Sequence, residues 1–101
     1  MLQLEFDSTI IEWRGPAPFF FAALPAADCA RIAAVARQSS YGWGVIPVEA
    51  ELAGFAFTTS LFPRDGRYLL PLKAALRKAT QVTLGDSIHV RLTVIFAARP
   101  R

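Results

Sequence analysis

The chain has 101 residues, of which 53% are hydrophobic and 19% charged, with eight Phe, two Trp and two Tyr. This composition excludes a disordered chain and favours a single domain, residues 1–101, with a compact, aromatic-rich core. The net charge of +3 is unevenly spread, because residues 1–51 carry three basic and six acidic side chains and residues 52–101 carry eight basic and two acidic ones.

The sequence begins with two predicted strands separated by a turn. In the first strand Leu2, Leu4 and Phe6 occupy one apolar phase, and from Asp7 the other phase takes over with Thr9, Ile11 and Trp13. This change of phase predicts a bulge or bend near Asp7 and Ser8. In the second, residues 17–24, the three consecutive phenylalanines Phe19–Phe21 predict a strand that is buried on both faces or lies at an interface.

A helix, a loop and a third strand follow. Pro25 can open an Ala-rich helix over residues 26–38, with Asp28 in its first turn. The apolar stripe of this helix would contain Cys29, Ile32, Ala33 and Ala36. In the next loop Tyr41–Gly44 is either an aromatic plug for one end of a barrel or a mobile binding element. Residues 45–52 alternate as a strand, and Pro47 predicts an edge position for it.

The second half of the chain contains a hairpin and a short helix. Residues 55–62 and 67–70 are predicted strands, joined by a turn over 63–66 because its Asp-Gly pair tolerates positive φ. Pro71 ends the second strand and suits the first position of an amphipathic helix. Leu72, Ala75, Leu76 and Ala79 form its apolar side. A Gly-Asp turn at 85–86 then leads into the last strand, which has the most regular alternation in the chain.

Five basic residues on this hairpin and helix form the candidate binding site. They are Arg64, Arg67, Lys73, Arg77 and Lys78. Either they form a cationic patch for the phosphates of nucleic acid or another anionic ligand, or they are a solvated charged surface. Residues 58–60 (Thr-Thr-Ser) could add hydroxyl groups to such a site. The uneven charge has the same two explanations: an anionic partner, or opposite charges on neighbouring strands of one sheet.

We predict no catalytic residue, metal site or cofactor. His89 lies near Asp86 and Ser87, but no strained turn or oxyanion hole is recognisable, so we interpret His89 as a surface histidine and Asp86 as a turn residue. One His and one Cys argue against a metal site, and the lone Cys29 excludes an intramolecular disulfide.

We expect a cytoplasmic protein with no membrane contact. The longest apolar run, residues 17–27, is about half the length of a bilayer span, and Pro25 interrupts it. The N-terminal residues lack the basic-then-apolar order of a secretory signal.

The sequence resembles a bacterial family over nearly its whole length. The resemblance is carried by Trp13, Gly15-Pro16, Phe20–Pro25, Gly42–Val48, Thr59–Pro63, Tyr68–Lys73, Arg77-Lys78 and Gly85-Asp86. These motifs are similar to those of the family known as domain of unknown function nineteen-oh-five. The resemblance implies a small double-split β-barrel, whose architectural relatives are AbrB-like and MazE-like regulators that bind DNA as intertwined dimers. The family has no established activity, so no catalytic residue carries over.

The sequence therefore predicts a mainly β (β-rich α+β) fold, a small double-split β-barrel with two short helices. We expect a homodimer formed through an apolar edge that includes Phe19–Phe21. The expected function is that of a non-enzymatic binding or interaction module of unknown ligand. The alternatives are a nucleic-acid-binding regulator of AbrB-like fold and an enzyme acting on an anionic small molecule.

Overall fold

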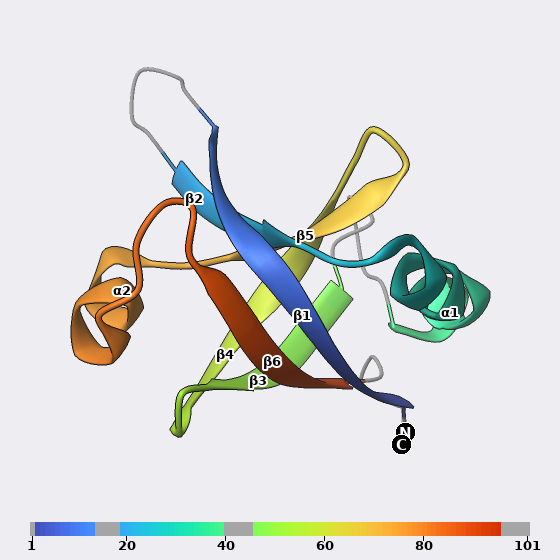
Figure 1. Cartoon of the computed structure of the whole chain (residues 1–101). Coiled ribbons are helices and arrows are strands. Elements are labelled where there is room, and N and C mark those ends of the chain that lie inside the picture. Colours follow the sequence, from blue (N-terminus) through green and yellow to red (C-terminus); the bar gives the residue numbers. More distant parts are fainter. Residues whose placement is uncertain (1, 14–18, 40–45, 96–101) are drawn as a thin grey trace.

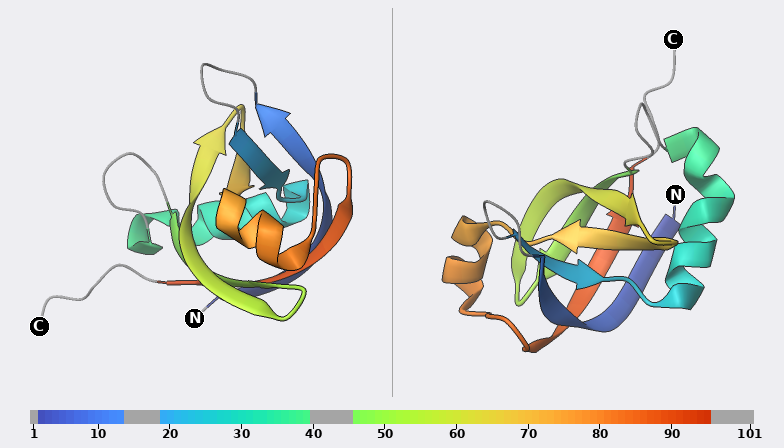
Figure 2. Two further views of the ribbon diagram at one scale, coloured as in Figure 1. Left: turned by 90° about the vertical axis from the view of Figure 1, so that its left-hand side faces the viewer. Right: turned by 90° about the horizontal axis from the view of Figure 1, so that it is seen from above.

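The described part of the chain forms a closed six-stranded barrel with a helix at each end. The computed structural model describes residues 2–13, 19–39 and 46–95. The strands follow one another around the barrel in the order β1-β2-β5-β4-β3-β6. The two helices lie on opposite sides of the barrel in Figure 1 and in the right-hand view of Figure 2. The predicted β-rich barrel with two short helices is confirmed.

The elements are β1 (Leu2–Trp13), β2 (Phe19–Ala23), α1 (Ala26–Ser39), β3 (Ile46–Leu52), β4 (Phe55–Arg64), β5 (Arg67–Pro71), α2 (Ala74–Thr80) and β6 (Ser87–Val94). Neither helix in this part of the chain has the length and hydrophobicity needed to cross a bilayer.

The barrel interior is filled by alternate residues of each strand. In β6 these are Ile88, Val90, Leu92 and Val94, and in β3 Ile46, Val48, Ala50 and Leu52, all at most 6% exposed. α1 packs against one end of this core through Cys29 and Ile32. α2 covers the other end with the partly buried Leu76. The period of two that the sequence shows in both strands therefore corresponds to the inward and outward faces of the barrel.

Two hairpins close through two-residue turns. Ala53-Gly54 connects β3 to β4 and Asp65-Gly66 connects β4 to β5, and all four residues have φ between 51° and 84°. Positive φ at both central residues gives the turn a twist that matches the strands. The Asp-Gly turn is thus confirmed, but Pro63 and Arg64 belong to β4, where they pair with β5.

β1 has no bulge in its middle, contrary to the prediction. Its residues 2–9 pair with β6 in unbroken register, and from Ile10 onward it pairs with β2. Ile10 is 1% exposed and Ile11 is 42% exposed, so the inward phase of the strand continues past the middle. The sequence shows an apparent change of apolar phase because the inward-facing residue Ser8 is polar. Its Oγ donates a hydrogen bond to the carbonyl oxygen of Ala23 at 2.6 Å. A satisfied hydroxyl can lie where an apolar residue was expected.

Barrel closure corrects the two predicted edge strands. β3 pairs with both β4 and β6, so Pro47 does not mark an edge. Pairing with β6 begins at Val48, and the carbonyl oxygen of Pro47 accepts the N–H of Ile95 at 2.9 Å. Pro47 has no backbone N–H, but it lies just beyond the last β3–β6 pair, so the sheet loses no hydrogen bond within that pairing. Likewise β2 lies between β1 and β5, so Phe19–Phe21 is not a free edge.

The helices begin and pack slightly differently from the prediction. Pro71 is the last residue of β5, and α2 begins at Ala74 after Lys73 as its N-cap. The intervening Leu72 is 2% exposed and fixes this connection in the core. In α1, Ala33 is exposed, so the buried stripe is narrower than predicted. The side chain of Ala36 and the loop Tyr41–Gly44 lie outside the described residues.

Candidate functional site

The five predicted basic residues lie in two groups at opposite ends of β5. Arg64 and Arg67 flank the hairpin turn on the side of α1, whereas Lys73, Arg77 and Lys78 belong to the α2 segment (Figure 1). From Arg67 to Pro71 the strand advances about 13 Å, at about 3.3 Å per residue. The structure thus brings the predicted cations to one side of the barrel, but not into one cluster.

Lys73 and Arg77 line a groove between α2 and strands β2, β4 and β5. This aromatic groove has a volume of about 610 Å³. Its rings come from Phe19, Phe20, Phe21 and Phe62, its hydroxyl groups from Thr59 and Ser60, and its positive charges from Lys73 and Arg77. Lys78 and Thr58 are not among the groove's described lining residues. Of the three predicted cations in the α2 segment, Lys73 and Arg77 therefore line the groove and Lys78 lies outside its described lining.

Arg77 is held in place by two contacts with the protein. Its guanidinium carbon lies 3.9 Å from the centre of the Phe20 ring, and its Nε donates a hydrogen bond to the carbonyl oxygen of Leu72 at 3.0 Å. A guanidinium stacked on a ring keeps its charge while losing rotational freedom. Among the described residues its terminal Nη groups have no hydrogen-bond partner. Arg77 is therefore a fixed cation with donors available to a ligand.

The groove floor is a small apolar cluster outside the barrel core. Phe21 is only 2% exposed, although it lies on the outward face of β2. Its ring packs edge-on against Phe62 with centroids 6.0 Å apart, and at a tilt against Phe19 with centroids 6.4 Å apart. Phe19 is 56% exposed and Phe62 is 40% exposed. Two exposed rings supported by a buried one form a surface suited to a flat apolar group.

At the other end of β5 the two hairpin arginines face each other across the strands. Arg64 and Arg67 are direct partners in the β4–β5 register. Arg67 donates from Nε and Nη2 to the carbonyl oxygen of Leu24, at 3.0 and 2.6 Å. These bonds fix the guanidinium without neutralising it. Both arginines line a hollow of about 310 Å³, the hairpin hollow, which shares Phe21 with the aromatic groove.

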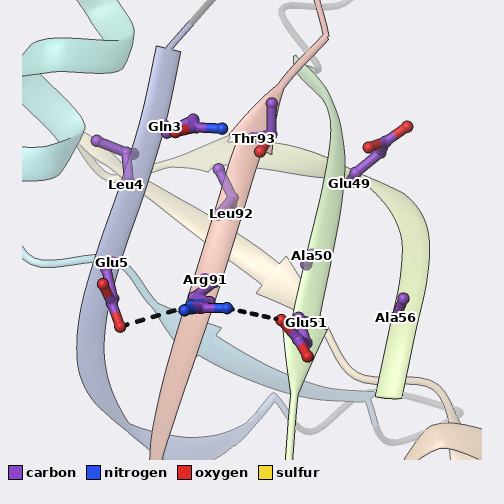
Figure 3. A pocket seen from close by; sticks show the side chains of 10 residues that line it. All are labelled: Gln3, Leu4, Glu5, Glu49, Ala50, Glu51, Ala56, Arg91, Leu92 and Thr93. Atoms are coloured by element: carbon purple, nitrogen blue, oxygen red, sulfur yellow. Dashed lines mark hydrogen bonds and ion pairs between the residues drawn. The ribbon is translucent and has the colours of Figure 1, made fainter. Parts of the chain in front are cut away.

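The opposite side of the barrel carries paired charges (Figure 3). Arg91 on β6 lies between Glu5 on β1 and Glu51 on β3, with nitrogen–oxygen distances of 3.7 and 3.3 Å. The explanation that places opposite charges on neighbouring strands is confirmed for this face. The hollow here, about 660 Å³, is larger than the aromatic groove. Its described lining has three carboxylates against one arginine and no aromatic ring, so we do not choose it as the site.

His89 belongs to the same charged face. Its Nδ1 lies 2.6 Å from Oδ1 of Asp7, and its Nε2 lies 2.6 Å from Oε2 of Glu5. With 55% of its side chain exposed, it is a surface histidine as predicted. The hydrogen bonds to Glu5 and Asp7 raise the pKa of His89, and the bond from His89 lowers the pKa of Glu5. Asp86 accepts the N–H of Thr83 at 2.9 Å, which confirms its role in the turn.

We expect the pKa of His89 to lie above its ordinary value of 6.5. Because the folded-state pKa is raised, the stabilisation from the charged histidine is fully present below about 6.5 and is lost as the pH rises through the folded pKa. The chain has one His, so proton NMR resolves its titration directly. Asp7→Asn and Glu5→Gln should each lower the midpoint, whereas Glu49→Gln, an exposed carboxylate on β3, should not. A wild-type midpoint at or below 6.5 contradicts this geometry.

Sequence comparison with protein families finds a match that spans nearly all of the barrel. Residues 6–92 match the family described as Domain of unknown function (DUF1905). The chain belongs to the DUF1905 family. The match runs from the middle of β1 to the middle of β6, so the DUF1905 region contains both helices, the aromatic groove and the hairpin hollow. No curated protein matches the chain. The family resemblance in the sequence is confirmed, and the AbrB-like relationship remains a prediction.

The sequence alone did not identify the rings of the DUF1905 groove. The sequence predicts that Phe19–Phe21 are buried on both faces of a strand or lie at an interface, and it predicts an ordinary strand around Phe62. Phe19, Phe21 and Phe62 all lie on outward positions, because Phe19 and Phe62 are exposed and Phe21 pairs with the exposed Ile11. The sequence signal that could have identified these rings is the presence of large apolar residues at outward positions of two strands.

Proposed function

We propose that the DUF1905 domain is a non-enzymatic binding module and that the aromatic groove is its binding site. The ligand is an organic anion with a flat apolar body. The observation that carries this proposal is Arg77, which is fixed by Phe20 and Leu72 in the wall of a groove with exposed rings. A cation that is already positioned binds an anion with little loss of conformational entropy.

The charge balance of the groove supports an anionic ligand. Its described lining includes Lys73 and Arg77 and no carboxylate. The Arg77 guanidinium can donate two parallel hydrogen bonds to a phosphate or carboxylate, and the Lys73 ammonium adds a second positive charge. Thr59 and Ser60 supply hydroxyl donors. The ligand's apolar part would lie against Phe19 and Phe62.

The same lining supports binding over catalysis. The hydroxyl groups of Thr59 and Ser60 have no His, Asp or Glu beside them in the described lining of the groove. A hydroxyl nucleophile needs an adjacent base to react at neutral pH. His89 and its carboxylates lie on β6 and β1, and β6 is opposite β5 in the strand order. The alternative, an enzyme acting on an anionic small molecule, therefore ranks behind a binding module.

Calorimetric titration with phenyl phosphate tests the proposal. We expect saturable binding, and weaker binding of benzyl alcohol, which has the ring without the charge. Arg77→Gln should raise the Kd at least about tenfold, because a hydrogen bond to a charged group contributes about 1.5–3 kcal/mol. Lys73→Gln should raise it by a smaller factor, since Lys73 has no contact that fixes it.

The matched control is Lys78→Gln, which removes the same charge from the same helix but from outside the described groove lining. Equal losses from Lys78→Gln and Arg77→Gln would show general electrostatic attraction and would refute the groove as the site. Turnover of phenyl phosphate, lost in Arg77→Gln, would replace the binding module with an enzyme.

A second copy of the chain is the candidate protein partner, because three exposed apolar side chains lie on this side of the barrel. They are Ile11, Phe19 and Phe62, which are 42%, 56% and 40% exposed. A homodimer would use this sheet face, since β2 is paired on both sides. Light scattering on the titration samples distinguishes a mass of 11.1 kDa from twice that value. A dimer that covers the rings should dissociate when phenyl phosphate is added, and a constant mass of 11.1 kDa would exclude the dimer.

A further inference from the structure

We infer that the anionic ligand is a single strand of nucleic acid that crosses the outer face of β2, β5 and β4. This inference rests on the proposed function, because it uses the aromatic groove as one end of a longer site. The other end is the hairpin hollow. The observation behind it is that exposed aromatic rings lie between two groups of cations on one side of the barrel.

The spacing of the cations fits several consecutive phosphates. Arg67 lies at one end of β5, and Lys73 follows the other end, so the two charges are separated by at least the length of that strand. That length, about 13 Å, corresponds to about four nucleotides of a stacked strand, which advances about 3.4 Å per nucleotide. A small anion would use only one end. The hairpin hollow also contains the carboxylates of Glu12 and Asp65, so its two arginines contribute guanidinium donors rather than net charge. Donors at both ends of a face about 13 Å long fit consecutive phosphates better than one small anion.

Both arginines that would contact phosphates are positioned by main-chain carbonyl groups. Arg67 donates to the oxygen of Leu24, and Arg77 donates to the oxygen of Leu72. Their positions are set before a ligand arrives, which lowers the entropic cost of binding. Arg64, which contacts the carboxylate of Asp65 at 3.8 Å, places a second guanidinium beside Arg67.

The rings between the cations favour unpaired bases. Phe19 and Phe62 are exposed, and each packs against the buried Phe21, so their faces stay in place. Every base has an aromatic face, and stacking on phenylalanine binds single strands without strong sequence preference. In a duplex the bases are stacked and paired, and these rings would have no partner. The face thus favours single-stranded over double-stranded nucleic acid.

The opposite side of the barrel directs a polyanion toward this face. The outward positions of β1, β6 and β3 carry the carboxylates of Glu5, Asp7, Glu49 and Glu51 against the side chains of Arg91 and His89. A nucleic acid is repelled there and attracted to the cations beside β5. The uneven charge that the sequence shows along the chain corresponds to an uneven distribution around the barrel.

Fluorescence anisotropy with labelled oligothymidylates tests the inference. Affinity should rise from about two to about four nucleotides and then level off, and a duplex should bind more weakly than a single strand of equal length. Between about 50 and 200 mM salt the log–log slope should be about −2 to −3, since each of three to four phosphates contributes about −0.7. Arg67→Gln and Lys73→Gln should each reduce the slope by about 0.7.

Phenylalanine variants separate stacking from charge. Phe19→Ala should weaken binding roughly tenfold without changing the salt slope. Phe55→Ala is the matched control, because Phe55 is 46% exposed but does not line either hollow, and it should leave the affinity unchanged. Thermal melting confirms that each variant is folded, and Arg64→Gln replaces Arg67→Gln if the latter unfolds.

The outcomes distinguish this inference from the proposed function. Binding of phenyl phosphate without length-dependent binding of oligothymidylate would overturn the nucleic-acid inference and leave the binding module standing. Duplex binding as tight as single-strand binding, or an unchanged affinity in both hairpin arginine variants, would also overturn it. If neither phenyl phosphate nor oligothymidylate binds, both proposals fail.

Discussion

Replacing Phe21 with alanine is expected to lower the free energy of unfolding by about 3–5 kcal/mol, the usual cost of removing a buried aromatic side chain. Phe21 faces away from the barrel core but is only 2% exposed, because Phe19 and Phe62 pack against it. At about 4–8 °C per kcal/mol for a domain of this size, the Tm should fall by at least about 12 °C. Urea denaturation followed by circular dichroism measures both effects.

Phe19→Ala is the control for this prediction. Phe19 is a phenylalanine of the same strand and the same face, but it is 56% exposed, so its removal should cost less than about 1 kcal/mol. Similar destabilisation by both variants would show that Phe19, Phe21 and Phe62 do not form a cluster with a buried centre on the outside of the barrel. The contrast matters for the site, because a buried Phe21 is what holds the two exposed rings in place.

Leu70→Ala is expected to lower the free energy of unfolding by about 2–5 kcal/mol. Leu70 has no exposed surface and lies on the inward face of β5, where its partner in β2 is Ala22. Because β5 is paired on both sides, with β2 and β4, the backbone around Leu70 is held in place and a cavity should remain. The total stability of a domain is about 5–15 kcal/mol, so this loss is a large fraction of it.

The matched control for Leu70→Ala is Leu84→Ala. Leu84 is 49% exposed in the turn before β6, and its truncation should change the stability by no more than about 0.5 kcal/mol. An effect of Leu70→Ala below about 1 kcal/mol in chemical denaturation would mean that the barrel interior collapses around the cavity, contrary to a closed and fully packed barrel.

The elements of this fold are predictable wherever the signal is local. The alternation from Ile88 to Val94 gives β6, and the Asp65-Gly66 pair gives the β4–β5 hairpin, since each signal lies within a few consecutive residues. The apolar positions of α1 are equally local, and two of them, Cys29 and Ile32, are buried as expected.

The errors arise where the outcome depends on residues distant in the sequence. Pro47 indicates an edge only if the sheet is open. The pairing of β3 with β6 that closes the barrel joins residues between 38 (Leu52 and Val90) and 46 (Val48 and Val94) positions apart in the sequence. Ser8 looks like a change of phase until Ala23, on another strand, provides its acceptor. Neither partner is identifiable from the alternation in its own segment.

The candidate site shows the same division. The cations Lys73 and Arg77 were predicted from their spacing on one helix, and both line the aromatic groove. The contact of Arg77 with Phe20 joins α2 to β2, which are more than 50 residues apart in the sequence. Local spacing could not predict it. The length of β5, by contrast, was available in the sequence and already implied that the hairpin arginines lie apart from the helix.

The measurement that tests the central claim most directly is a set of two-dimensional amide NMR spectra recorded during titration with phenyl phosphate. If the aromatic groove is the binding site, the largest shifts will come from residues 19–21, 59–62 and 72–77, and the amides of Gln3, Glu49 and Thr93 on the opposite face will not move. Shifts confined to that opposite face, or no shifts at millimolar ligand, would contradict the groove as the binding site of this domain.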